Sequence, residues 1–158
     1  LSISQHLSIS NKRMEGYLEA LHRNNLPANN DLIVACDRDE AKNNELIQEL
    51  LKRENRPDGI FASVEKLAIS TYKICEELQL NIPKDVKVIT FSNSYTAAFL
   101  NPSLTTVTQP AYEMGREAAA ILFKLIEKKK HHSAAESIVL NSRLIVRNST
   151  KGERDIES

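Results

Sequence analysis

Apolar residues in the first third of the chain recur first with helical spacing and then with strand-like continuity. The three- to four-residue spacing over residues 10–24, and again over residues 40–51, predicts two amphipathic helices. Asp39 precedes the second of these helices and is a suitable N-cap. Between them, residues 32–36 form an unbroken apolar run, which is typical of a strand covered on both faces.

The centre of the chain, residues 56–91, shows the pattern of a β-α-β unit. Pro57 and Gly59 mark a turn, residues 60–62 form a short apolar strand, and a helical pattern runs from there to about residue 79. A second apolar run, residues 86–91, predicts another strand. Two strands joined in this way lie parallel in one sheet, and the helix crosses one face of that sheet.

Polar residues 92–95 form a loop, and residues 104–107 have the β-branched composition of a strand. Pro110 suits the first turn of a helix that ends near the lysines at 128–130. Residues 138–140 and 144–146 indicate one long or two short strands, followed by a charged tail. The alternation of elements predicts an α/β fold with a doubly wound, mainly parallel sheet. The apolar stripe of the last helix comprises Ala111, Met114, Ala118, Ile121, Leu122 and Leu125.

Length and charge limit the classes of function. The 158 residues make about one domain, and 21 basic residues balance 21 acidic ones. Because no basic surplus exists, we do not expect this chain by itself to bind DNA sequence-specifically. It contains no apolar run of about 18 residues and no signal-peptide pattern, so we expect no membrane association. A chain that begins at Leu1 without Met is expected to be a fragment.

Nothing in the sequence indicates catalysis, a cofactor or a metal. Cys36 and Cys75 fall inside predicted apolar elements, which favours buried free thiols in a reducing compartment over a disulfide or a metal pair. His131 and His132 follow a lysine run and are typical of a solvated loop rather than a metal site. The chain has no glycine-rich phosphate loop and no nucleophile motif, so we predict that it is not an enzyme.

Ligands of open α/β sheets bind outside the carboxyl ends of the strands. Hydroxyl and amide groups there both donate and accept hydrogen bonds, and together with charged groups they suit a sugar-like ligand. The same residue types also serve as helix caps and turn formers, which is the alternative interpretation. The residues that directly follow predicted strands are Asp37, Arg38, Ser63, Val64, Ser92 and Asn93.

Three segments carry a resemblance to a known family: PDGIFAS, ELQLNIPKDVKVITF and NPSLTTVTQPAYEMGREAA. Their order and spacing resemble the effector-binding domain of LacI/GalR-family bacterial transcriptional regulators, over roughly residues 5–148. The resemblance implies a periplasmic-binding-protein-like fold (type I), truncated at its N-terminus. The operator-binding helix-turn-helix would lie outside this chain.

The same resemblance implies a division of the chain between two subdomains. Residues 1–104 would form the C-terminal subdomain, and residues 105–141 would contain a crossover and a helix of the other subdomain. Residues 142–148 would be the return strand, and residues 149–158 a tail.

The resemblance also assigns roles to individual residues. Arg13 falls on the family's effector-contacting arginine, and Gln109 matches a glutamine near the crossover. Ser92 stands where an aspartate commonly holds a sugar hydroxyl, Val64 where an asparagine is common, and Arg38 where some members have an aromatic residue. The alternatives are a solvated helix charge for Arg13, a surface salt bridge for Arg38 and a helix cap for Gln109.

A homodimer is the implied assembly. Phe99 and Leu100 are apolar residues in a polar loop, which a partner would explain; the alternative is that both fold under their own loop. The resemblance therefore predicts the cytoplasmic ligand-sensing domain of a regulator that binds a small sugar-like effector. A periplasmic sugar receptor of a transport system is the alternative. The predicted dimer residues are Ile69, Tyr72, Lys73, Ala98, Phe99 and Leu100.

Overall fold

The computed structural model describes residues 1–3, 8–128 and 137–152. Its main sheet has four strands in the order β3-β4-β5-β6, with the first three parallel and β6 antiparallel to β5. A parallel pair, β1 with β2, lies beside it. The nitrogen of Leu1 donates to the oxygen of Phe61 (2.8 Å) and the nitrogen of Ser63 to the oxygen of Leu1 (2.9 Å), so both sheets form one layer. The strands are β1 (Ser2–Ile3), β2 (Ala35–Cys36), β3 (Gly59–Ala62), β4 (Lys87–Phe91), β5 (Thr105–Thr108) and β6 (Arg143–Ile145).

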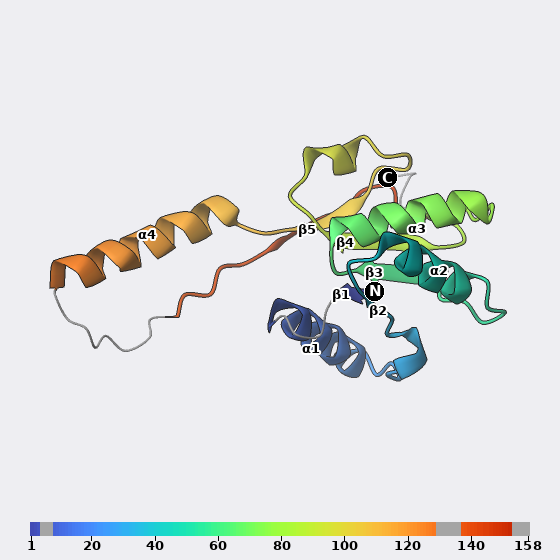
Figure 1. The fold of residues 1–158 in the computed structure, drawn as a ribbon, viewed down its shortest axis with the longest axis horizontal. Coiled ribbons are helices and arrows are strands. Elements are labelled where there is room, and N and C mark those ends of the chain that lie inside the picture. The colour runs from blue at the N-terminus through green and yellow to red at the C-terminus, as the bar shows by residue number, and fades with distance from the viewer. Residues whose placement is uncertain (4–7, 129–136, 153–158) are drawn as a thin grey trace.

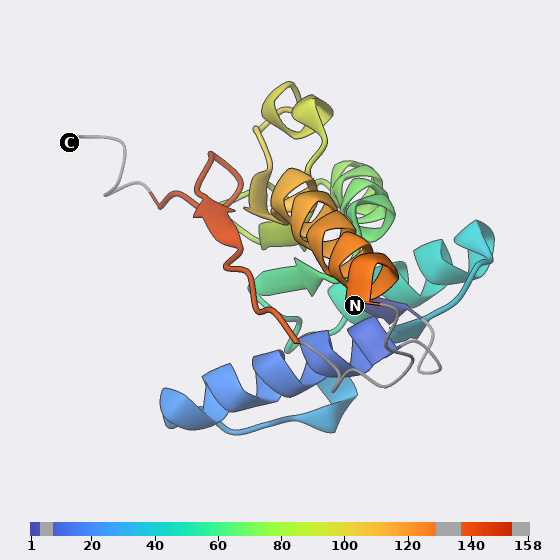
Figure 2. The ribbon, with the colours of Figure 1, turned by 90° about the vertical axis from the view of Figure 1, so that its left-hand side faces the viewer.

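Helices cover both faces of this layer, as a doubly wound fold requires. α2 (Glu40–Leu51) and α3 (Glu65–Glu77) pack against one face, and α1 (Ser8–Arg23) crosses the other (Figures 1 and 2). The predicted α/β class and the three helices are therefore confirmed. Asp39 caps α2 as predicted, because its carboxylate accepts from the nitrogens of Ala41 (3.0 Å) and Lys42 (3.3 Å).

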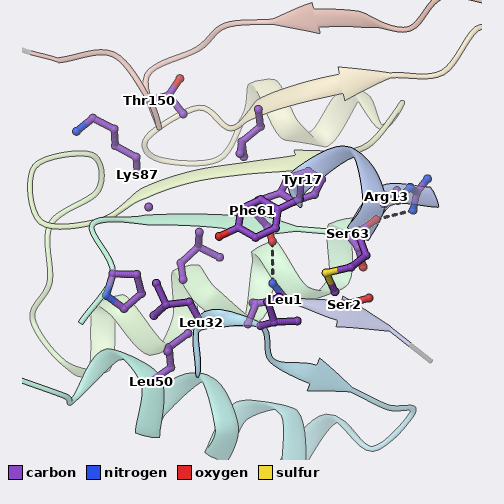
Figure 3. A pocket seen from close by; sticks show the side chains of 16 residues that line it. Leu1, Ser2, Arg13, Tyr17, Leu32, Leu50, Phe61, Ser63, Lys87 and Thr150 are labelled. Carbon is purple, nitrogen blue, oxygen red and sulfur yellow. Dashed lines mark hydrogen bonds between the residues drawn. The ribbon is translucent and has the colours of Figure 1, made fainter. Parts of the chain in front are cut away.

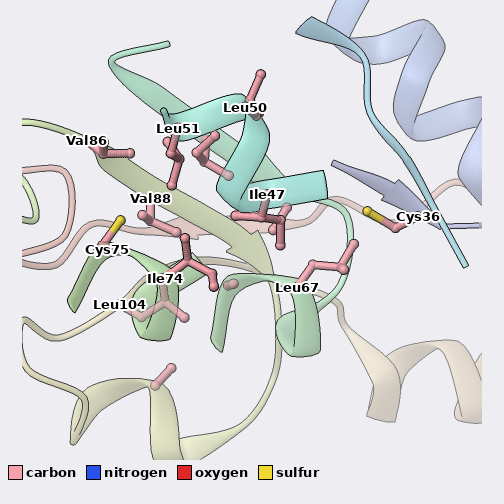
Figure 4. Close-up of a cluster of buried hydrophobic side chains, with 14 residues drawn as sticks. Cys36, Ile47, Leu50, Leu51, Leu67, Ile74, Cys75, Val86, Val88 and Leu104 are labelled. Carbon is pink, nitrogen blue, oxygen red and sulfur yellow. The ribbon is translucent and has the colours of Figure 1, made fainter. Parts of the chain in front are cut away.

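The hydrophobic core lies between the sheet and the pair α2–α3 (Figure 4). Alternate strand residues such as Ile60, Ala62 and Val88 face these helices, because successive side chains of a strand point to opposite faces. Burying each large apolar side chain contributes about 1.5–3 kcal/mol to folding. The helical side of this core comprises Ile47, Leu50, Leu51, Leu67, Ala68, Ile74 and Cys75.

Cys36 and Cys75 are both buried and free, which confirms the prediction. Burial raises the pKa of the Cys75 thiol to about 11 and also raises that of Cys36. Because the thiolate is the reactive form, both side chains behave as small core residues.

Two predicted strands are shorter than the apolar runs that suggested them. The run at 32–36 starts in a 3-10 turn, η1 (Asn30–Leu32), because the side chain of Asn29 accepts from the nitrogen of Asp31 (2.9 Å) and holds the turn. Only β2 pairs, and Ala35 is exposed, so the prediction of a strand covered on both faces was wrong. Residues 138–140 form no strand. Thr108, the last residue of β5, pairs with Arg143, so no partner strand extends beyond that point.

The predicted tail begins with a buried residue that is hydrogen-bonded to the sheet. Ser149 is fully buried, and its hydroxyl donates to the oxygen of Val88 (2.6 Å) and accepts from the nitrogen of Thr105 (2.8 Å). Its side chain thus bridges β4 and β5 near their amino ends. Residues 153–158 of that tail lie outside the described residues.

α4 (Ala111–Lys128) is the predicted last helix, and it extends away from the sheet and the other helices (Figure 1). β5 leads into it and β6 returns from it side by side. Most of its apolar side chains are exposed, with Phe123 at 63% and Leu122 at 56%. His131 and His132 lie outside the described residues. No helix in the described part of the chain is both long and apolar enough to cross a membrane.

Candidate functional site

The candidate site lies where the carboxyl ends of β3 and β4 meet the first turns of α1. Arg13 of α1 donates through Nη1 to the oxygen of Ser63 (2.6 Å; Figure 3). Its guanidinium lies 4.3 Å from the centroid of the Phe91 ring. Partial burial lowers the pKa of Arg13, but a guanidinium stays protonated in proteins. The structure therefore holds a cation in a fixed position at the sheet edge and brings it to Ser63.

Ser63 itself is buried, and its main chain is engaged on both sides, because its nitrogen donates to the oxygen of Leu1 (2.9 Å) and its oxygen accepts from Arg13. Its Oγ accepts from the nitrogen of Ile3 (3.2 Å), which ties β1 to the end of β3. Val64 packs against the hydrophobic core and caps α3 without a side-chain hydrogen bond. At the position of Val64 the site consequently offers no polar side chain.

The end of β4 carries a second polar group. Ser92 Oγ donates to Glu65 Oε2 (2.7 Å) and accepts from the nitrogen of Ser94 (2.9 Å). Thr96 Oγ1 donates to Glu65 Oε1 (3.1 Å). Glu65 is the first residue of α3, so this group joins the helix start to the loop after β4.

Asn93 joins the ends of β4 and β5. Its Nδ2 donates to the oxygen of Gln109 (2.7 Å), and its Oδ1 accepts from the nitrogen of Gln109 (2.7 Å). Within the part of the chain that the structure describes, the side chain of Gln109 makes no hydrogen bond, and so it does not cap α4. The structure thus brings Asn93 and Gln109 together through the main chain of Gln109.

Asp37 and Arg38 follow β2 and make no contact with the Arg13 or Ser92 groups among the described hydrogen bonds and ion pairs. Asp37 accepts from the nitrogen of Asp39 (2.7 Å) and pairs with Lys42 (3.2 Å). Both contacts lower the pKa of Asp37, and the hydrogen bond from Asp39 has the larger effect. Arg38 is exposed and forms no ion pair with any described residue. The surface salt bridge considered for Arg38 is therefore not observed.

A pocket of about 250 Å³ lies between α1 and the sheet, next to this edge (Figure 3). Arg13 and Ser63 line one end of it, and Lys87 and Thr150 line the other. Ligand pockets usually measure about 300–1,000 Å³, so this pocket would extend a site at the edge rather than form a complete site. The side chains between the two ends are mainly apolar, among them Met14, Tyr17, Phe61 and Ile89.

Phe91 and Glu65 also lie at this edge, and the sequence did not predict them as site residues. Phe91 has a detectable signal, because alternation along β4 places it on the face opposite the buried Val88, where its ring packs against Phe61 with centroids 5.7 Å apart. Glu65 has none, because an acidic residue in the first turn is an ordinary feature of helices.

The predicted dimer surface is only partly exposed. Ile69 is 48% exposed, and Lys73 pairs loosely with Glu77 (3.9 Å). Tyr72 is half-buried and its hydroxyl donates to the oxygen of Pro102 (2.8 Å). Burial raises the pKa of Tyr72 to about 12.

Phe99 and Leu100, the two apolar residues in the loop after β4, differ in their burial. Phe99 is 79% exposed and packs edge-on against Tyr95, with ring centroids 6.2 Å apart. Leu100 packs against the hydrophobic core. Ala98 is exposed beside them, at the end of the 3-10 turn η2 (Tyr95–Ala98). The alternative that both residues fold under their own loop therefore holds for Leu100 and not for Phe99.

Residues 2–150 match the family described as the periplasmic binding protein-like domain. The transcriptional repressor PurR of Actinobacillus pleuropneumoniae is 30% identical over 151 residues, which cover 94% of this chain and 45% of the repressor. A solved complex of the transcriptional regulator CelR with cellobiose is 27% identical, with a TM-score of 0.84 and coverage of 94% and 45%. A sugar-binding LacI-family regulator from Escherichia coli, complexed with phosphate, is 28% identical, with a TM-score of 0.78 and coverage of 94% and 52%.

The doubly wound sheet and the family match together define the class as a periplasmic binding protein-like domain. The chain belongs to that family, and the relatives it matches are transcriptional regulators. It spans about half the length of the relatives it matches. Transcriptional regulators are also the class of protein that the resemblance in the sequence implies.

Proposed function

We propose that this chain senses a small polyhydroxylated effector, a sugar or a sugar derivative, at the carboxyl edge of its sheet. In the complete cytoplasmic protein, effector binding would change the operator affinity of a helix-turn-helix domain that lies outside this chain. The observation that carries the proposal is the fixed guanidinium of Arg13, which rests on the Phe91 ring and bonds the oxygen of Ser63.

Preorganisation explains why this arrangement suits a ligand. A guanidinium has five N–H donors, and only one contact to Ser63 is formed, so donors remain for hydroxyl or ring oxygens. Since the side chain is already ordered, a ligand loses little free energy in immobilising it. The cellobiose bound by CelR, a relative of similar fold, supports a sugar as the class of ligand.

We further propose that α4 belongs to a second subdomain. β5 and β6 run side by side as crossover strands and carry α4 away from the sheet, with its apolar stripe exposed. The divisions predicted from the sequence, at residues 104, 141 and 148, fit this arrangement, although Ser149, in the predicted tail, is hydrogen-bonded to the sheet. Effector binding at the edge next to β5 would then favour one relative arrangement of the two subdomains.

A thermal-shift screen of the complete effector domain tests the proposal. The panel comprises cellobiose, glucose, galactose and ribose, with phosphate and glutamate as ligands of other classes. A sugar at 100 times its Kd stabilises the native state by about 2.7 kcal/mol. The proposal predicts such stabilisation for at least one sugar; stabilisation by glutamate alone, or by none of the compounds, would contradict it.

A further inference from the structure

The hydrogen bonds around Ser92 have a defined direction. The nitrogen of Ser94 can only donate, so Ser92 Oγ accepts there (2.9 Å), and its single proton goes to Glu65 Oε2 (2.7 Å). Ser92 therefore has no proton left for a ligand. Any group that approaches Ser92 meets an acceptor.

Glu65 extends this acceptor surface. Its other oxygen accepts from Thr96 Oγ1 (3.1 Å), and Thr96 in turn shares a hydrogen bond with Ser94 Oγ (2.6 Å). A carboxylate has about four acceptor positions, so some stay open after two hydroxyls have bonded. No basic side chain in the described part of the chain pairs with Glu65; its charge is stabilised by hydroxyls and by the N-terminal end of α3.

Arg13 supplies hydrogen-bond donors and a positive charge on the other side of the strand ends. It contacts Ser63 and Phe91, which lie two residues before Glu65 and one residue before Ser92. The edge thus presents donors at Arg13 and acceptors at Ser92 and Glu65. Of the other charges near strand ends, Asp37 is paired with Lys42, and Arg38 is exposed beyond β2.

We propose that Glu65 is a specificity-determining residue of the effector site, which selects a neutral or amino sugar and rejects an acidic one. A hydroxyl or ammonium group donates to Ser92 and Glu65, whereas a carboxylate or phosphate oxygen would face two acceptors and a like charge. Such juxtaposition of like charges is a common means of rejecting wrong partners. This inference rests on the proposed sugar-sensing function and adds the chemical class of the sugar.

The competing explanation is that Glu65 only braces the loop after β4. Thr96→Val separates the two roles, because it removes one brace to Glu65 and leaves the charge in place. A bracing role predicts that Thr96→Val and Glu65→Gln lower the melting temperature alike and leave the preference among sugars unchanged. A selective role predicts a change in preference for Glu65→Gln alone.

The experiment is isothermal titration calorimetry of the complete effector domain with glucose, glucosamine and glucuronate, and with galactose, galactosamine and galacturonate. The parent is expected to bind a neutral or amino sugar at least about tenfold more tightly than the matching uronate. Glu65→Gln keeps the shape and removes the charge, so it should reduce that ratio to about twofold or less, while Thr96→Val should preserve it.

The possible results distinguish the role of Glu65 from the proposed sugar-sensing function. A parent that prefers the uronate, or a ratio that Glu65→Gln leaves unchanged, would overturn the role of Glu65 while sugar sensing stands. A parent that binds none of the six sugars would count against the proposed sugar-sensing function, and the role of Glu65 would fall with it.

Discussion

The thiol of Cys75 and the hydroxyl of Tyr72 are two groups whose pKa values burial raises, to about 11 and about 12. Both are neutral at pH 7. In the unfolded chain they would lose their protons near their ordinary values of 9.0 and 10.0, so the folded state holds these protons more tightly. Their neutral forms favour folding below pH 9, and that advantage is lost as the pH rises towards 11 and 12.

The loss of this stabilisation at high pH leads to a prediction. Urea unfolding at pH 8, 9, 10 and 10.5 should show a falling free energy of unfolding, with Cys75 contributing at most about 1.4 kcal/mol per pH unit between 9 and 11. Cys75→Ala should have a shallower decline than the parent over that interval. Identical slopes for the two proteins would show that the thiol does not retain its proton on folding.

Residue types and local spacing predicted the side chains whose partners are close in sequence. The cap by Asp39, for example, involves only residues two and three positions away. Ser92 and Glu65, however, are 27 residues apart, and Asn93 and Gln109 are 16 apart. Their contacts depend on the register of neighbouring strands, which no local pattern contains. This is why Glu65 was missed and why Asn93 could be predicted only as a residue at a strand end.

Among the elements, β4 and β5 depend on a segment from the far end of the chain. The nitrogen of Val88 donates to the oxygen of Ser149 (3.1 Å), and the hydroxyl of Ser149 bridges the oxygen of Val88 and the nitrogen of Thr105. The segment after β6 thereby holds the amino ends of β4 and β5 together, and β5 is the strand that leads into α4.

We predict that Ser149→Ala destabilises the domain by about 1–3 kcal/mol, because the buried nitrogen of Thr105 would lose its acceptor. The neighbouring Asn148 is exposed, and Asn148→Ala should change the free energy of unfolding by less than about 0.5 kcal/mol. Urea denaturation of both variants measures the difference. Equal stability of the two variants would mean that the bridge is dispensable.

The helices were predictable as elements, because the spacing of their apolar residues is a property of the chain alone. Strand lengths were not, since a strand extends only as far as its partner does: β6 begins at Arg143, opposite Thr108, the last residue of β5. An apolar run also gives no sign of a side chain such as that of Asn29, which holds a turn at the start of the run at 32–36.

At the scale of the whole molecule, the alternation of strands and helices was sufficient to predict a doubly wound sheet. The periodicity of α4 predicted an amphipathic helix but not its position, because the same stripe would suit a helix packed on this sheet. The paired strands β5 and β6 determine that position, and the proposed subdomain division came from the resemblance alone.

Association of two copies is the second prediction at the scale of the whole molecule. We expect the complete effector domain to form a dimer that buries the exposed Phe99 and its neighbour Tyr95. Phe99→Asp should weaken the dimer by about 1.5–3 kcal/mol, or roughly tenfold or more in dissociation constant. Sedimentation velocity over a concentration series measures this change.

Leu26 provides the matched control, because it is 55% exposed in a different loop. Leu26→Asp should leave the dimer unchanged. If both variants dissociate equally, or if the parent is a monomer, this surface is not the dimer interface.

The central claim is that a ligand at the carboxyl edge of this sheet alters DNA binding by the complete protein. The most direct measurement is the operator affinity of the full-length regulator, by fluorescence anisotropy, with and without the sugar that gives the largest thermal shift. The parent should show a change of about 5- to 150-fold. Arg13→Ala should reduce this change to less than about twofold with basal affinity intact, while Lys12→Ala, an exposed neighbour on α1, should respond like the parent. An unchanged response of Arg13→Ala would contradict the assignment of the site.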